Sequence, residues 1–169
     1  MVAASATPAG TDVGVPSTLV PAGWPLPAPP ATPHLRMAPL GPEHHERDHA
    51  AWSSSIDHIR ATPGFRPEVW GGDAWPYPMP PEQNLADLVQ HAQEFAAREA
   101  FAYTVLDPRS DDVIGCVYID PDDSGAADVM VRCWVRASHA ELDEELAATV
   151  RSWLTREWPF GTVRFPERD

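Results

Sequence analysis

The sequence contains no lysine, because all 12 of its basic residues are arginine. A chain without an ε-amine has no P-loop lysine, no Schiff-base lysine and no lysine for pyridoxal phosphate. Basic residues are also few, and the formal net charge is −13. Binding to nucleic acid or to an anionic membrane needs a basic surface, so we expect neither partner. An acidic surface suits amine-bearing partners, or simply keeps a protein in solution.

Long apolar runs and paired cysteines are also missing. No segment approaches the roughly 18 apolar residues of a membrane span, and the first residues lack the basic and apolar regions of a secretory signal. Cys116 and Cys133 lie far apart in predicted strands, which favours two buried thiols in a reducing compartment. We therefore expect a cytoplasmic protein. The motifs GxSxG, GxGxxG and CxxC are absent, so a hydrolase, a dinucleotide-binding protein or a thiol redox protein has no sequence support.

Residues 1–33 differ in composition from the rest of the chain. They hold eight of the 20 prolines and no basic residue. Such a segment buries too little apolar area to offset the entropy of ordering, and proline favours extended conformations. We predict a disordered leader over residues 1–33 and one domain over residues 34–169, a length that suits one well-cored domain.

The apolar spacing in residues 34–169 predicts alternating strands and helices. Strands are expected at 34–40, 101–106, 113–119, 128–136 and 162–165, and helices at 43–60, 82–99 and from 138 to about 158. Residues 65–81, rich in proline and aromatic residues, form a long loop of the kind that is often functional. The order β-α-α-β-β-β-α-β predicts an α+β fold with a mixed, mostly antiparallel sheet flanked by helices.

This order, together with residues 101–108 and 113–119, resembles the GNAT superfamily of N-acetyltransferases over residues 35–165. The resemblance implies acyl transfer from acetyl-CoA to a primary amine of an unknown small-molecule or peptide acceptor. It also implies that the cofactor lies between two splayed strands, with its diphosphate at the start of the next helix. The alternative is a catalytically degenerate GNAT-fold binding or interaction module.

The resemblance further implies roles for individual residues. The general base is expected at Asp128, and the acid for the leaving thiolate at Tyr103 or Tyr118. The cofactor-binding positions are Trp134, Val135, Arg136, Ser138, His139 and Ala140. The first helix and the loop after it border the acceptor in the family, which gives the candidate pocket residues His45, His49, Trp70, Trp75 and Tyr77.

The cofactor loop departs from the family pattern, because residues 136–143 contain no glycine. A backbone that approaches phosphate closely normally needs glycine. Ser138 followed by Glu141 predicts a capping box, which turns the Glu141 carboxylate onto the N–H groups at the helix start. Like charges in contact near a surface repel by about a few kcal/mol, so we expect weak binding of acetyl-CoA.

The chain is also shorter than the family pattern, with 12 residues after Glu157. The family normally continues with another helix and two more strands. Their lack leaves an open strand edge near residues 162–165 or beside residues 128–136. An open edge invites another chain, so we expect a homodimer.

His45, Glu46 and His49 spell HExxH, in which two histidines bind zinc and the glutamate activates water. The two intervening residues are charged, and Glu68, the candidate third ligand, lies in the 65–81 loop. A zinc protein is therefore the remotest alternative, and we expect no metal. The histidines instead continue the apolar face of the first helix towards the rim of the sheet.

Overall fold

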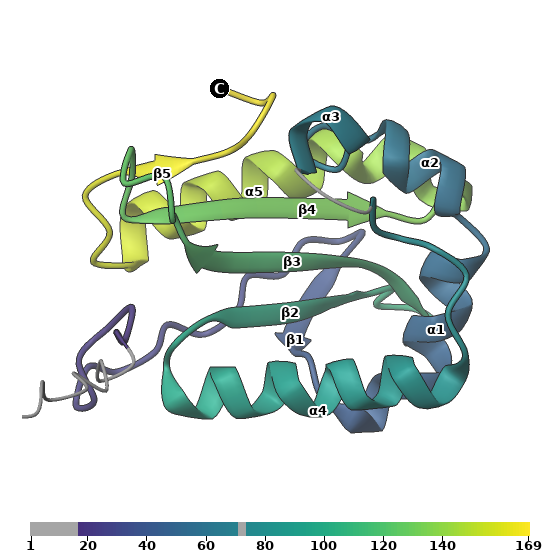
Figure 1. Ribbon diagram of the computed structural model, residues 1–169, viewed down its shortest axis with the longest axis horizontal. Helices are drawn as coiled ribbons and strands as arrows, with labels where there is room; N and C mark the ends of the chain where they lie inside the picture. The colour runs from purple at the N-terminus through teal and green to yellow at the C-terminus, as the bar shows by residue number, and fades with distance from the viewer. Residues whose placement is uncertain (1–16, 71–73) are drawn as a thin grey trace, which may run out of the picture.

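The computed structural model describes residues 17–70 and 74–169 (Figure 1). In chain order the elements are β1 (Arg36–Pro39), η1 (Pro42–His44), α1 (His45–Ser53), α2 (Ile56–Ala61), α3 (Pro67–Trp70), α4 (Pro81–Ala97), β2 (Phe101–Leu106), β3 (Val113–Pro121), β4 (Val129–Val135), η2 (Ala137–Leu142), α5 (Asp143–Glu157) and β5 (Val163–Arg164). The predicted α+β class is confirmed. The 65–81 segment, predicted as a loop, contains the short helix α3.

The five strands form one sheet in the order β1-β2-β3-β4-β5. The first three pairings are antiparallel, whereas β5 runs parallel to β4. Close approach of β3 and β4 requires Gly115, since a Cβ atom there would lie 2.3 Å from the Trp134 carbonyl oxygen. The β4–β5 ladder contains only the pairs Val129–Val163 and Met130–Arg164. The rest of the outer edge of β4 therefore extends beyond β5.

Strand side chains alternate between two cores, one on each face of the sheet. Val131 of β4 packs in one core with Val150 of α5. Trp134 of β4 packs in the other with Trp52 of α1 and Leu88 of α4. Figure 1 shows α5 behind β4, with α4 running beside β2 on the other side. No helix within the described residues is long and apolar enough to cross a membrane.

The helix predicted over residues 43–60 is divided at Ser54 and Ser55. The Ser55 hydroxyl accepts a hydrogen bond from the Ala137 N–H (3.0 Å), and the Arg136 guanidinium donates to the Ser54 hydroxyl (3.3 Å). Serine side chains that bond elsewhere compete with helical continuity. These two hydrogen bonds attach the break between α1 and α2 to the residues that follow β4.

The prediction of a disordered leader is wrong for residues 17–33, which pack on the domain. Val20 is 1% exposed, and the Trp24 ring lies 5.7 Å from the Trp158 ring. The Arg98 guanidinium donates to the Trp24 carbonyl at 2.6 Å. A proline-rich chain has fewer conformations to lose, so a few large apolar residues suffice to dock it. The remainder of the predicted leader lies outside the described residues.

Candidate functional site

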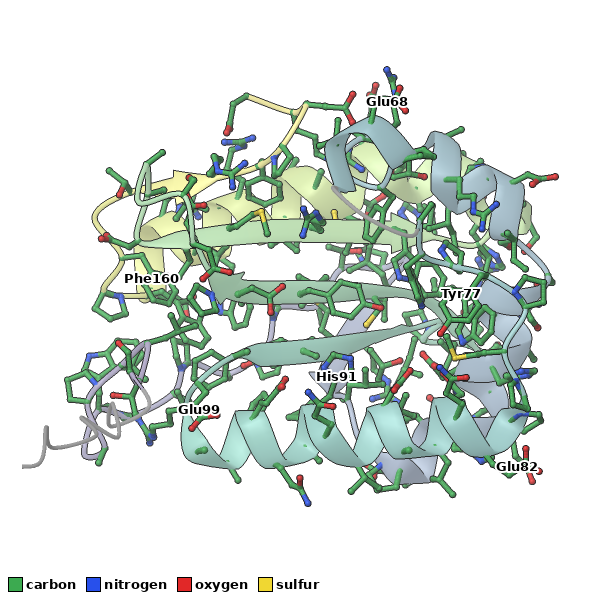
Figure 2. All side chains as sticks on the ribbon, viewed as in Figure 1. Glu68, Tyr77, Glu82, His91, Glu99 and Phe160 are labelled. Carbon is green, nitrogen blue, oxygen red and sulfur yellow. The ribbon has the colours of Figure 1, made fainter. Side chains whose placement is uncertain are left out.

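A cavity of about 210 Å³ lies on the side of the sheet that α1 and α4 cover. Its apolar walls come from Leu40, Trp75, Leu88 and Tyr118. Its polar lining consists of Asp48, Asn84, Asp87, His91, Asp120 and Arg132. Figure 2 shows His91 on the side of α4 that faces the sheet. The cavity thus combines aromatic walls with three carboxylates.

Asp48 projects from α1 into a buried hydrogen-bonded network. Its carboxylate accepts a bond from the Asn84 side-chain amide (3.1 Å), and the Asn84 carbonyl oxygen accepts one from the Trp52 indole (3.0 Å). Burial raises the pKa of Asp48 to about 6, although the bond from Asn84 favours the charged form. The network joins α1 to α4 and holds a carboxylate at the cavity wall.

Asp120 and Arg132 come from neighbouring strands and share the cavity face of the sheet. In the β3–β4 register, Tyr118 lies opposite Arg132 and Asp120 lies opposite Met130. Burial raises the pKa of Asp120 to about 6, while the Arg132 guanidinium opposes that rise. The Arg132 Nε–H also donates to the Gly64 carbonyl at 2.9 Å. Asp120 therefore gains its negative charge at a higher pH than an exposed aspartate does.

Trp75 is the central ring of an aromatic cluster around the cavity. Its ring centroid lies 6.2 Å from that of Tyr118 at an interplanar angle of 83°, and 6.1 Å from that of Trp134. The His91 ring lies 5.7 Å from Tyr118, and burial lowers the His91 pKa. Aromatic faces beside carboxylates favour organic cations.

Asp48→Asn is expected to stabilise the protein above pH 6. A carboxyl whose pKa is raised on folding holds its proton between about pH 4 and pH 6, where the unfolded chain has lost it. The wild type therefore loses stability as the pH rises through that window, by roughly 2–3 kcal/mol. The variant keeps a side-chain oxygen for Asn84 but has no charge to bury.

Urea unfolding at pH 4 and at pH 7.5 measures this effect. The stability difference between Asp48→Asn and the wild type should grow with pH, whereas the exposed Asp57→Asn on α2 should show no such trend. An equal difference at both pH values would mean that the Asp48 carboxylate is well solvated.

The five predicted pocket residues do not all line the cavity. Trp75 does so. The His45 side chain instead donates to the carbonyl of Pro81 (2.9 Å), the first residue of α4, and His49 donates to that of Met79 (3.1 Å) just before it. Tyr77 is 37% exposed, with its hydroxyl bonded to Gln83. The Trp70 side chain lies outside the part of the chain that the structure describes.

The HExxH histidines therefore bond to backbone carbonyls. Within the described residues no group of three or more histidine, cysteine, aspartate or glutamate side chains is arranged to hold a metal ion. Figure 2 shows Glu68 on α3 at the periphery, and it is exposed.

The predicted catalytic residues also separate. Tyr118 lines the cavity, and its hydroxyl accepts a bond from the Trp134 indole at 3.2 Å. Tyr103 lies in the core on the other face, 1% exposed and 5.2 Å from the Trp153 ring. Asp128 is exposed, and its carboxylate accepts the N–H groups of Gly161 (2.7 Å) and Thr162 (3.0 Å). These contacts give Asp128 a role in the turn before β5.

The residues predicted to bind the cofactor lie at the end of β4 and in η2. Trp134 and Val135 are fully buried on opposite faces, and Arg136 donates to Val113. Ala140 is exposed in η2.

The predicted capping box does not form. The Ser138 hydroxyl bonds to the His139 Nδ1 at 2.8 Å, and neither η2 nor α5 has a side-chain cap. The cause is that the chain enters α5 through η2, which is kinked at His139 (φ −126°, ψ 27°), so Ser138 lies inside this kinked segment and not at a helix N-cap.

CoA at the positions implied by the resemblance does not fit the residues present. Three acidic residues, Asp143, Glu144 and Glu145, form the first turn of α5, where their charges oppose a diphosphate. Both Asp143 oxygens accept bonds from Arg168 at 2.8 Å. Arg168 also reaches the Cys133 carbonyl on β4 at 3.5 Å. The helix start and the nearby edge of β4 are already engaged by the chain itself.

The sequence analysis predicted none of the six polar residues that line the cavity. A pattern that could have identified three of them is present, since Asn84, Asp87 and His91 recur at helical spacing and so share one face of α4. Asp48 likewise lies four residues before Trp52, on the apolar face of α1. Charged residues on an otherwise buried face are the feature that identifies such a site.

No protein-family model and no curated protein matches this sequence. Solved structures match by fold. A ribosomal-protein-S5-alanine acetyltransferase from Vibrio fischeri has 12% identity and a TM-score of 0.56, over 76% of this chain and 67% of that one. An acetyltransferase from Salmonella typhimurium that modifies the N-terminal serine of ribosomal protein L7/L12 has 12% identity and a TM-score of 0.54, over 80% and 71%.

A RimL acetyltransferase in complex with coenzyme A also matches, with 11% identity and a TM-score of 0.54 over 76% of this chain and 68% of that one. This chain spans roughly two thirds of the length of these acetyltransferases. Its fold is that of the GNAT superfamily, as the element order predicted.

Proposed function

We propose that this protein binds a small organic cation, of the class of primary amines, in the cavity between the sheet and helices α1 and α4. The supporting observation is the lining, in which Asp48, Asp87 and Asp120 accompany one arginine, Arg132. At neutral pH this composition leaves a negative potential beside aromatic walls. A bound ammonium ion neutralises that potential and gains cation–π contact.

N-acetyl transfer to the bound amine is the second candidate. The three solved structures compared above are acetyltransferases of ribosomal proteins, which favours a peptide amine as the acceptor for this candidate. An amine attacks only after losing its proton, and a carboxylate with a pKa of about 6, such as Asp120, is suited to accept it. We place binding first because the chain does not fit CoA where the resemblance puts it.

Calorimetric titration at pH 7.5 with butylamine and with 1-butanol tests the proposal. The amine should bind at least about tenfold more tightly than the alcohol, because charge-assisted bonds exceed neutral ones by about 1.4 kcal/mol or more. Equal affinities would overturn the proposal. Mass spectrometry of the amine after incubation with acetyl-CoA then separates the candidates, since an acetylated product supports transfer and unchanged amine supports binding alone.

The two cysteines bear on the compartment of the protein. Cys116 and Cys133 are free and buried, which suits a reducing compartment such as the cytoplasm.

A homodimer remains a prediction. The edge of β4 that we expected to be open is partly covered by β5 and by Arg168, so pairing through that edge has less support than the sequence suggested.

A further inference from the structure

Residues 165–169, which follow β5, fold back against the domain. Phe165 is 1% exposed, and the Arg151 guanidinium lies 4.6 Å from the centre of its ring. The Asp169 carboxylate accepts the Phe165 N–H at 2.8 Å and the Arg151 guanidinium at 2.9 Å. The segment is therefore a compact turn attached to α5.

Arg168 projects from this turn into the space between α5 and β4. Its side chain is 11% exposed and makes a bidentate pair with Asp143. The same guanidinium donates to the Cys133 carbonyl on β4. A planar guanidinium with five donors is suited to bridging a carboxylate and a carbonyl in this way. One side chain thus joins the helix start to the strand edge.

Glu167 joins the same segment to the loop before α3. Its carboxylate accepts the Gly64 N–H at 2.9 Å and lies 3.3 Å from the Arg66 guanidinium. A Cβ atom at Gly64 would lie 3.4 Å from Arg132 and 3.5 Å from the Pro166 carbonyl oxygen. The loop and residues 165–169 are therefore in contact beside β4.

We propose that residues 165–169 close the edge of β4 and the start of α5 to CoA. Arg168 of this segment contacts Asp143 at the helix start and Cys133 on β4, beside the positions where the resemblance to the GNAT superfamily puts CoA. CoA then binds only to the fraction of molecules in which the segment has left, so its apparent affinity falls by that fraction. The proposal is independent of what occupies the cavity on the other side.

Titration of the full chain with CoA itself, which cannot acetylate, tests the closure. Wild-type protein should show no binding up to about 1 mM, and Arg168→Gln should bind at least about tenfold more tightly. Arg156→Gln, an exposed arginine in the last turn of α5 and so at the opposite end of the helix from Asp143, is the matched control and should behave as the wild type. Should Arg168→Gln fail to fold, Glu167→Gln loosens the segment from the loop side and should show the same gain.

Hydrogen exchange supplies a second measurement. The amides of Phe165 and of residues 167–169 should exchange faster in Arg168→Gln than in the wild type, and this increase should accompany the gain in CoA binding. Micromolar binding of CoA by the wild type that Arg168→Gln weakens would overturn the proposal, because Arg168 would then be a ligand of CoA. A folded variant with faster exchange but no better binding would also overturn it.

Discussion

Asp120→Asn is expected to weaken binding of butylamine at pH 8 by roughly 10- to 100-fold, the range of one charge-assisted hydrogen bond. The substitution keeps the size of the side chain and removes the charge that faces the cavity. The pKa of Asp120 is about 6, so the wild-type carboxylate is charged at pH 8 and largely neutral at pH 5. Binding to the wild type should therefore strengthen as the pH rises through this window, and the variant should lose part of that rise.

Asp57→Asn is the matched control. Asp57 is an exposed aspartate of α2, and its substitution removes the same charge away from the cavity. Calorimetric titrations of both variants at pH 5 and pH 8 separate a local contact from the general attraction of an acidic protein. Equal weakening by both would mean that long-range charge supplies the affinity, and it should then disappear at high salt. No weakening in Asp120→Asn would remove Asp120 from the binding site.

The strands and helices were predictable from the sequence because each has a regular apolar period. The site was less predictable, and α4 shows why. The apolar spacing of residues 82–99 includes Leu85 and Val89, yet each of these side chains is 38% exposed. Asn84 and His91 face inward in their place. Polar residues that hydrogen-bond to one another inside a protein are of the same types as those on a solvent-exposed helix face. The spacing of apolar residues alone therefore does not show which polar residues of α4 are buried.

Contacts between distant parts of the chain were the other limit. The sequence near Ser138 predicts a cap from local spacing, but the acidic start of α5 is satisfied by Arg168, 25 residues from Asp143. No local pattern contains that pair. The same holds for the stretch around Trp24, whose partner Trp158 lies at the other end of the chain. Composition identified this stretch as proline-rich, but it could not show that a surface complementary to Trp24 exists.

Deletion of residues 1–33 is expected to lower the melting temperature by about 10 °C or more. Val20 is buried in the core that faces α5, and Leu19, Trp24 and Leu26 pack against it. Returning one full side chain and parts of three others to water costs roughly 3–5 kcal/mol, and about 3 kcal/mol corresponds to about 10 °C for a domain of this size. Thermal unfolding monitored by circular dichroism measures the change.

Point substitutions attribute the loss to particular contacts. Trp24→Ala removes the ring that lies against Trp158 and should account for roughly 2 kcal/mol of the deficit, since the side chain is half-buried. Thr18→Ala, at an exposed position of the same segment, should leave the melting temperature unchanged. A deletion variant that melts within about 2 °C of the wild type, a shift of less than about 1 kcal/mol, would show that residues 17–33 add little to the core. The domain would then begin at β1, where the sequence alone placed it.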